Sequence, residues 1–196
     1  MNSAGFEFRR VRRADLGMIY RWRQAEHVRE WWDPPASWEA FRQKMLARVT
    51  GNHAVEPYLM LYDGRPAGYI QTYSLAASPG TRAALGLLAT DAGIDLFIGE
   101  REYLHRGLGP QFLRAFLRDI LFARADVTGC GIWPEPGNAI AIAAYERAGF
   151  RYLRTVTIPP QNEHAYLMYM ARGELWRDVF AGGSASALHG AAPPRG

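Results

Sequence analysis

The feature that most constrains the fold of this chain is a glycine-rich turn between two segments of opposite character. The turn reads His105-Arg106-Gly107-Leu108-Gly109-Pro110. The apolar run 93–99 before it predicts a buried strand, and the amphipathic segment 111–118 after it predicts a helix. Glycines at such a junction allow a ligand to approach the backbone, and the free N–H groups of a helix start can bind phosphate.

Two interpretations of this turn stay open when it is taken alone. Arg106 adds a fixed positive charge, which favours a phosphate ligand. Pro110 is expected at the first helical position, where its missing N–H costs little. The alternative is a tight turn that binds nothing, because glycines before a helix are a weak signal.

The composition is that of an ordinary globular domain. The chain has 196 residues, of which 48% are hydrophobic, enough for one domain with a real core. We expect that domain over 1–181 and a disordered tail over 182–196, which is rich in glycine, serine and alanine. No run approaches the roughly 20 apolar residues of a membrane span. Because the N-terminus also lacks a signal pattern, a cytoplasmic protein without membrane association is expected.

Charge and cysteine content narrow the function classes further. The formal net charge is +4, Lys44 is the single lysine, and the arginines are scattered without a basic stripe carrying aromatic residues. We therefore expect no nucleic-acid partner. The single cysteine, Cys130, excludes an internal disulfide, and the five histidines show no metal-ligand spacing, so no metal site is expected.

The order of the expected elements indicates a mixed α/β domain with a central, mostly antiparallel sheet. Asp15 is close enough to the start of the first helix to cap it, and 74–92 is an irregular segment of the kind that often forms a lid or substrate loop. The expected strands are 6–11, 57–62, 67–73, 93–99, 127–133, 151–159 and 165–171. The expected helices are 15–30, 37 to about 49, 110 to about 123, and 138 to 149.

A second segment, downstream of the glycine turn, helps to interpret that turn. Residues 134–150 contain Asn138, an expected N-cap, and end in Tyr145-Glu146-Arg147-Ala148-Gly149-Phe150. The turn and this segment, in this order, resemble the GNAT acyltransferase superfamily. The resemblance implies a sheet of six to seven strands with about four helices, splayed open where acetyl-CoA binds. It also implies a set of residues that bind acetyl-CoA: Leu96, Phe97, Ile98, His105, Arg106, Gly107, Leu108, Gly109, Pro110, Asn138 and Ala141.

Over roughly residues 6–171 the chain resembles one branch of that superfamily, the aminoglycoside 6′-N-acetyltransferases. The resemblance is carried by 27–32, 68–73, Gly93-Ile94-Asp95, the glycine turn and the Tyr145 element. It implies that Asp95 is the base for the substrate amine and that Tyr145 is the acid for the CoA thiolate. It also implies that Trp31, Trp32, Gln71 and Tyr73 line the substrate pocket. The expected activity is acetyl transfer to the 6′-amine of an aminoglycoside, by a monomer or homodimer.

The chemistry agrees with these roles, although each residue also has a structural interpretation. The attacking amine must be neutral, and the leaving thiolate benefits from a proton. A carboxylate inside an apolar run is costly, so Asp95 needs either a catalytic role or an arginine partner. Tyr145 can be a core residue, the tryptophan pair can pack helix ends, and Asn138 can be an N-cap alone.

The chain departs from the branch at two places that concern the acceptor. Ile132-Trp133-Pro134 replaces the family's Thr-Asp-Pro element, so Glu135 is a candidate substitute for the lost carboxylate and Trp133 can stack on a sugar. The segment 78–90 contains no acid, whereas a pocket for polycations should be anionic. Two alternatives therefore remain: a GNAT enzyme for another amine, such as a siderophore N-hydroxylysine, and a non-catalytic CoA-binding module.

Overall fold

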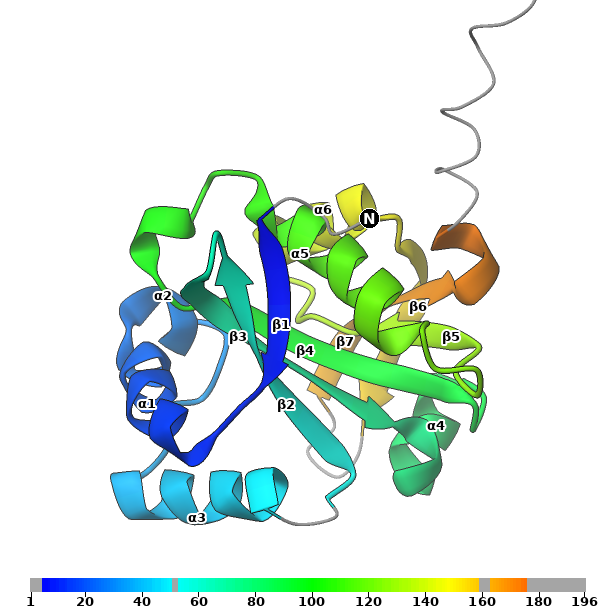
Figure 1. Ribbon diagram of the computed structural model, residues 1–196. Helices are drawn as coiled ribbons and strands as arrows, with labels where there is room; N and C mark the ends of the chain where they lie inside the picture. The colour runs from blue at the N-terminus through cyan, green and yellow to red at the C-terminus, as the bar shows by residue number, and fades with distance from the viewer. Residues whose placement is uncertain (1–4, 51–52, 159–162, 176–196) are drawn as a thin grey trace, which may run out of the picture.

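A seven-stranded sheet forms the centre of the computed structural model, which describes residues 5–50, 53–158 and 163–175 (Figure 1). The strand order is β1-β2-β3-β4-β5-β7-β6, and neighbours are antiparallel except β4 and β5, which are parallel. The strands are β1 (Phe6–Arg10), β2 (Val55–Tyr62), β3 (Arg65–Ser74), β4 (Asp91–Ile98), β5 (Gly129–Ile132), β6 (Arg151–Ile158) and β7 (Glu163–Ala171). The mixed, mostly antiparallel sheet predicted from the sequence is confirmed.

Helices cover both faces of this sheet. They are α1 (Leu16–Gln24), α2 (Glu26–Arg29), α3 (Trp38–Thr50), α4 (Pro79–Leu85), α5 (Leu108–Phe116) and α6 (Ala139–Ala148). Side chains alternate across β2, so Leu59 packs against α1 and α3 whereas Tyr58 and Met60 pack against α5. The largest buried cluster is therefore the one beneath α5, centred on Phe112 and Phe116.

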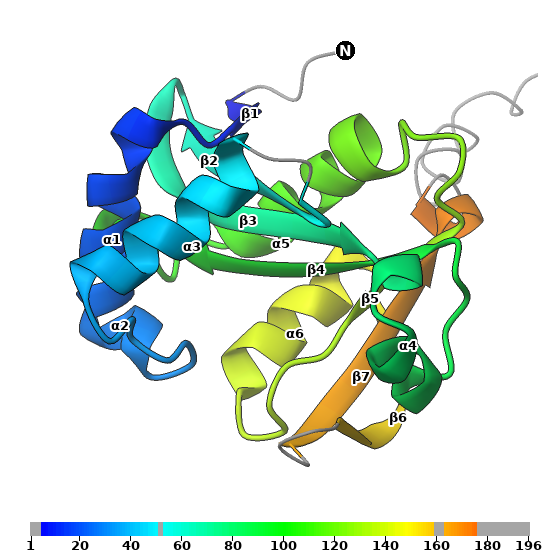
Figure 2. The same ribbon diagram turned by 90° about the horizontal axis from the view of Figure 1, so that it is seen from below.

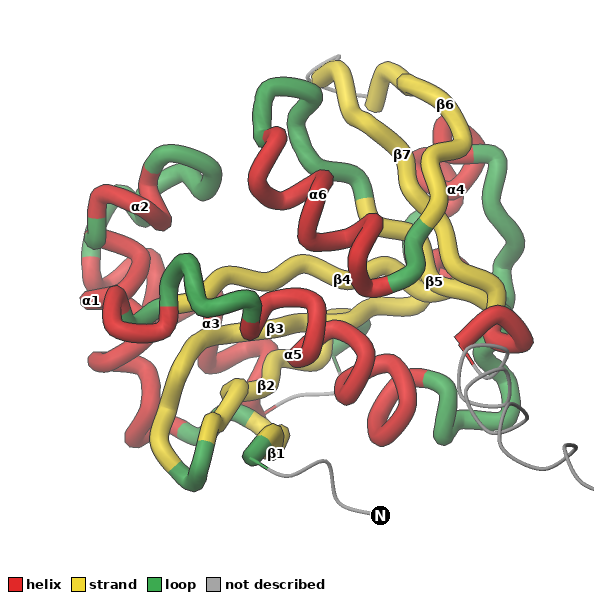
Figure 3. Tube along the Cα trace, turned by 90° about the horizontal axis from the view of Figure 1, so that it is seen from above, coloured by secondary structure: helices red, strands yellow, loops and turns green. Residues whose placement is uncertain are grey.

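The sheet opens where β4 meets β5. Their parallel pairing covers three positions and ends at Gly93 and Gly131, while β4 runs on to Ile98 beside β3 alone. Figures 2 and 3, from opposite sides, both show the two halves of the sheet diverging from this point, with α6 in the opening. Side chains at Gly93 would collide with the rings of Tyr73 and Trp133, so glycine is required at the last paired position. The backbone of 94–98 thus has no strand partner on its β5 side among the described residues.

Several predicted elements need correction. Residues 74–92 are not irregular: they form a 3₁₀ turn, Leu75–Ala77, and helix α4, whose Leu85 packs against β6 and β7. The helix predicted over 15–30 is broken at Ala25, whose backbone is extended. Asp15 is the N-cap residue of α1, but its side chain makes no capping bond to that helix. Its carboxylate instead accepts from the Arg12 N–H, at the start of the 3₁₀ helix Arg13–Asp15, and pairs with Arg9 at 2.7 Å.

Two more expectations concern the ends of elements. Pro110 is the third residue of α5 rather than the first, a position where the N–H would still have no helical acceptor. Asn138 caps α6, and Gly149 ends it with φ +105°, both as predicted. The predicted disordered tail, 182–196, lies outside the described residues.

The core beneath α5 gives a stability prediction. Phe112 is fully buried and meets the ring of Phe6 edge-on, with ring centroids 4.9 Å apart. Phe112→Ala removes this ring from a packed core and is expected to lower the free energy of unfolding by roughly 3–5 kcal/mol. Urea denaturation measures the change. Leu88→Ala, at a side chain 62% exposed, is the control and should change stability by less than about 0.5 kcal/mol.

Candidate active site

A cleft of about 900 Å³ opens between the diverging strands. Its walls come from the α1–α3 side of the sheet, from β4, from the turn before α5, and from α6. It unites fourteen of the residues predicted from the sequence: Trp31, Trp32, Gln71, Asp95, Leu96, Phe97, Ile98, His105, Gly109, Trp133, Glu135, Asn138, Ala141 and Tyr145. The sequence therefore identifies most of one continuous surface.

Asp95 is held in the cleft by its neighbours on β3. Gln71 lies opposite Asp95 in the β3–β4 register, and its Nε2 donates to Asp95 Oδ2 at 2.7 Å. The hydroxyl of Tyr73 donates to the other carboxylate oxygen at 3.3 Å. The arginine ion pair considered from the sequence is replaced by these two neutral donors.

A second layer fixes the Gln71 amide. Its Oε1 accepts from Arg48 Nη1 at 2.9 Å and from the Tyr69 hydroxyl at 2.8 Å. Both acceptor directions of the amide oxygen are thereby used, which leaves the Nε2 group to face Asp95. The side chain of Asp95 is positioned by a chain of contacts that begins on α3.

Burial raises the pKa of Asp95 above its usual range. The hydrogen bonds from Gln71 and Tyr73 and the positive charge of Arg48 oppose that rise without cancelling it. Burial, together with the charge of Asp95, also raises the pKa of Tyr73 well above 10. A carboxylate with a raised pKa next to neutral donors is a good proton acceptor near neutral pH.

Tyr145 approaches from the other side of the opening. It lies on α6, packs against the cluster beneath α5, and lines the cleft. Burial, followed by the charge of Asp95, raises its pKa above the usual value of a tyrosine. The phenol is therefore protonated at neutral pH, and it is close enough to Asp95 for the carboxylate charge to raise its pKa.

The glycine turn has the geometry of an anion cradle. His105 and Gly107 both have positive φ, 58° and 68°, on either side of Arg106. Gly107 is the N-cap of α5, so the N–H groups of Leu108 and Gly109 have no acceptor within the helix. Arg106 is exposed beside them. These groups fit the pyrophosphate of a CoA donor.

The chain is similar in sequence to known proteins. The sequence pattern of the family described as "Acetyltransferase (GNAT) domain" matches residues 12–158. The chain belongs to the GNAT acetyltransferase family. It is 32% identical over 158 residues to the aminoglycoside N(6′)-acetyltransferase type 1 of Klebsiella pneumoniae, covering 74% of this chain and 73% of that one.

Solved structures agree with this assignment. The crystal structure of the aminoglycoside acetyltransferase AAC(6′)-Ib with coenzyme A and kanamycin superposes with a TM-score of 0.75 at 30% identity. The match covers 89% of this chain and 99% of that chain. An uncharacterised protein from Bacillus halodurans superposes with a TM-score of 0.79 at 22% identity, over 90% of this chain and 91% of that one, which shows the shared fold. The open, GNAT-like sheet predicted from the sequence is confirmed.

Some aromatic residues of this site only line the cleft, and others also pack against neighbouring rings. Trp31 lines the cleft, whereas Trp32 also packs edge-on against Phe97 at 5.0 Å. Trp133 lines it and meets Tyr73 edge-on at 6.0 Å. Trp32 and Trp133 thus both line the cleft and pack against aromatic side chains of the sheet.

Some predicted residues lie outside the cleft lining. They belong to the glycine turn or sit behind Asp95: Tyr73, Arg106, Gly107, Leu108 and Pro110. Leu108 is buried in the core and Tyr73 supports Asp95, whereas Arg106 and Gly107 face solvent at the mouth of the turn. The expected substrate loop, 78–90, contributes nothing to the lining as described.

Sequence reasoning missed several residues of the site. Tyr69 shares a strand face with Gln71 and Tyr73, so the period of two along β3 was the signal for it. Arg23, His27, Lys44 and Arg48 also line the cleft, from α1, α2 and α3. No local pattern on those helices shows that they meet β3.

The described ranges hold neither a metal-binding cluster nor a membrane-spanning helix. In 5–50, 53–158 and 163–175, no cluster of three or more histidine, cysteine, aspartate or glutamate side chains is arranged to hold a metal. Across those same residues, no helix has the length and apolar character to cross a membrane.

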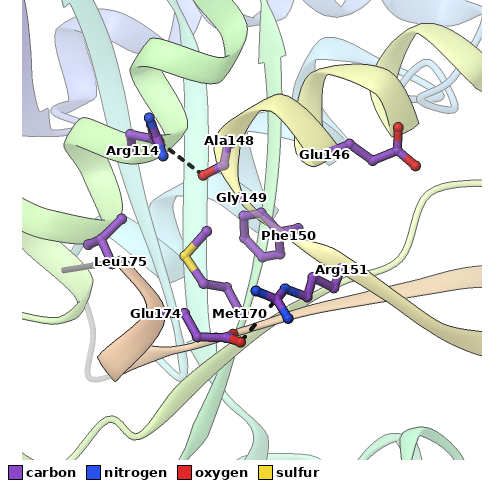
Figure 4. A pocket seen from close by; sticks show the side chains of 9 residues that line it. All are labelled: Arg114, Glu146, Ala148, Gly149, Phe150, Arg151, Met170, Glu174 and Leu175. Atoms are coloured by element: carbon purple, nitrogen blue, oxygen red, sulfur yellow. Dashed lines mark hydrogen bonds and ion pairs between the residues drawn. The ribbon is translucent and has the colours of Figure 1, made fainter. Parts of the chain in front are cut away.

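A smaller cavity of about 240 Å³ lies behind α6 (Figure 4). There Arg114 Nε donates to the carbonyl of Ala148 at 3.2 Å, and Arg151 Nε lies 3.8 Å from Glu174. These contacts join α5 to α6, and the start of β6 to the segment that follows β7. None of the predicted site residues lines this cavity, and we interpret it as part of the packing between these elements.

The glycine turn before α5 leads to a prediction about the affinity for CoA. Gly107→Ala puts a side chain at φ +68° and next to the free N–H groups, so the affinity for CoA is expected to fall about tenfold or more. Isothermal titration with CoA measures it. Gly137→Ala is the matched control, because Gly137 has ordinary φ and open space around it. Equal affinities in the two variants would contradict the assignment of the turn to the pyrophosphate.

Proposed function

We propose that this protein transfers the acetyl group of acetyl-CoA to the 6′-amine of an aminoglycoside. The observation that carries the proposal is the partly buried Asp95, oriented by Gln71 and Tyr73 inside the cleft. It is supported by relatives named aminoglycoside N(6′)-acetyltransferase and by a related structure that holds coenzyme A and kanamycin.

Asp95 serves as the general base in this proposal. Acetyl-CoA supplies the activated acyl thioester. Asp95 takes the proton from the acceptor ammonium, so that the neutral amine can attack the thioester carbon. Its raised pKa supports the role, because a carboxylate of ordinary pKa has little affinity for a proton near neutral pH.

Tyr145 serves as the general acid. Its raised pKa keeps the phenol protonated, and its position on α6 puts it across the opening from Asp95. The proton passes to the thiolate as the tetrahedral intermediate collapses. Backbone N–H groups on the open side of 94–98 are the candidates for stabilising the oxyanion.

We also propose that the enzyme acts in the cytoplasm, as a monomer or homodimer, on a small-molecule amine. The described cysteine, Cys130, is buried and free, which fits a reducing compartment.

A thiol-release assay with acetyl-CoA and kanamycin tests the proposed function. The expected result is turnover, with a product acetylated at the 6′-amine by mass spectrometry and NMR. Acetylation of polyamines or amino acids with kanamycin untouched would favour the other amine acceptors, and no turnover of any amine would favour a CoA-binding module.

The role of Asp95 predicts a characteristic dependence on pH. Asp95→Asn should lower kcat about 10²-fold or more, because the variant has no base for the bound ammonium. The wild type can turn over the ammonium form, so its kcat should stay level until the pH falls to the raised pKa of Asp95. The variant can use only the neutral amine, so its kcat should already fall below the pKa of the amine.

The kcat of each enzyme is measured across pH at a saturating concentration of the acceptor. The raised pKa means that the wild-type kcat should begin to fall above the ordinary aspartate value of about 3.9. Profiles of the same shape in the two enzymes would assign Asp95 a structural role.

Tyr145→Phe separates acid catalysis from packing. The ring remains and the hydroxyl is lost, so kcat should fall about 10²-fold while the dissociation constant of acetyl-CoA changes less than about twofold. Single-turnover kinetics and calorimetry give the two quantities. A large loss of acetyl-CoA affinity with an unchanged single-turnover rate would make Tyr145 a packing residue.

A further inference from the structure

Three cationic side chains line the part of the cleft that α1 and α3 form, and we call them the cationic wall. They are Arg23 from α1 and Lys44 and Arg48 from α3. They are close enough to affect one another. Burial lowers the pKa of Arg23, the charges of Tyr69 and Asp33 oppose that shift, and the charge of Arg48 adds to it. Burial, followed by the charges of Arg48 and Arg23, lowers that of Lys44. The single lysine of the chain thus lies where positive charge is already unfavourable.

None of these cations forms an ion pair with a carboxylate within the described part of the chain. Arg48 donates to the amide of Gln71, and Arg23 donates to the backbone carbonyl of Asp33. The ion pairs found among residues 5–50, 53–158 and 163–175 involve none of the three. Arg23 and Arg48 are partly buried, whereas Lys44 is exposed, and a bound anion would recover part of the free energy that burying the two arginines costs.

The wall also holds unused donors. Arg23 Nε and Arg48 Nε are both buried without a hydrogen-bond acceptor in the described structure. The Arg23 guanidinium is held over the ring of Trp32, at 4.9 Å from its centroid. A fixed guanidinium with a free N–H is well suited to a carboxylate or phosphate oxygen.

The position of this wall relates it to the catalytic carboxylate. Arg48 touches Gln71, and Gln71 touches Asp95, so the cationic wall begins two contacts away from the base. An acceptor amine at Asp95 therefore has an anion-binding surface within the reach of a short molecule. A polycation would instead be attracted by the carboxylates that line the same cleft, which are Glu30, Asp33, Asp95 and Glu135.

We propose that Arg23, Lys44 and Arg48 form an anion subsite, and that the protein acetylates amines that also carry a carboxylate or phosphate group. This second acceptor class uses the same acetyl-transfer chemistry and so rests on the catalytic part of the proposed function. The anion binds the subsite while the amine at the other end of the molecule faces Asp95. Proton and acetyl transfer then proceed as for any primary amine.

The test compares acceptors that differ in one group. ω-Amino carboxylic acids and ω-amino alkyl phosphates of graded length are each paired with the amino alcohol of the same length, and kcat/KM is measured by thiol release. The charged member of a pair should be favoured roughly tenfold to a hundredfold, as for a hydrogen bond to a charged group. The carboxylate and phosphate series show which oxyanion the subsite prefers.

Lys44→Met removes one charge and keeps the aliphatic stem. It should lower the ratio of charged to neutral kcat/KM about tenfold. Arg42→Met is the matched control, because Arg42 is exposed on the same helix and outside the cleft lining. It should leave the ratio unchanged. Calorimetry of the wild type and both variants with glutarate and inorganic phosphate measures the subsite without catalysis.

The two proposals fail in distinguishable ways. Turnover of kanamycin with no preference within the pairs, and no binding of glutarate or phosphate, would overturn the anion subsite alone. Anion binding that is lost in Lys44→Met but kept in Arg42→Met supports the subsite even where kanamycin is not acetylated. Equal effects of the two substitutions would reduce the wall to general surface charge and overturn the inference.

Discussion

The structure of the site depends on how short the parallel pairing of β4 and β5 is. Three paired positions join the two halves of the sheet, and the pairing stops at Gly93 and Gly131, where the rings of Tyr73 and Trp133 lie over the backbone. Had the ladder continued, the backbone of 94–98 would be satisfied by β5 and the cleft would be closed. The opening brings Asp95 and Tyr145, which come from opposite faces of the sheet, into one cleft.

The strand alternation of β3 then determines the surroundings of Asp95. Tyr69, Gln71 and Tyr73 share a face because side chains repeat every second residue. The register puts Gln71 opposite Asp95, and antiparallel neighbours are close enough for a direct hydrogen bond. Arg48 adds a fixed orientation of the amide and a positive charge. A shift of one residue in this register would turn the whole set away from the cleft.

Strong local signals explain how much could be predicted from the sequence. The β2–β3 hairpin, the turn before α5 and both ends of α6 follow from residues with few conformational alternatives, such as Gly107 and Gly149 at positive φ. Helix α4 could not be predicted, because it is short, buries Leu85 alone, and is stabilised by contact with β6 and β7. The same limit applies to the site: Asp95 and Tyr145 lie in recognisable motifs, whereas Arg23 and Arg48 reach the cleft through tertiary packing.

The charges along the cleft suggest why the base and the cationic wall are adjacent. Burial raises the pKa of Asp95. The hydrogen bonds from Gln71 and Tyr73, with the charge of Arg48 behind them, lower it without cancelling that rise. Arg48 therefore has two effects, since it lowers the pKa of the proposed base and contributes positive charge to the proposed anion subsite. The proposed subsite also gives Arg23 and Lys44, beside Arg48, a role in binding the acceptor.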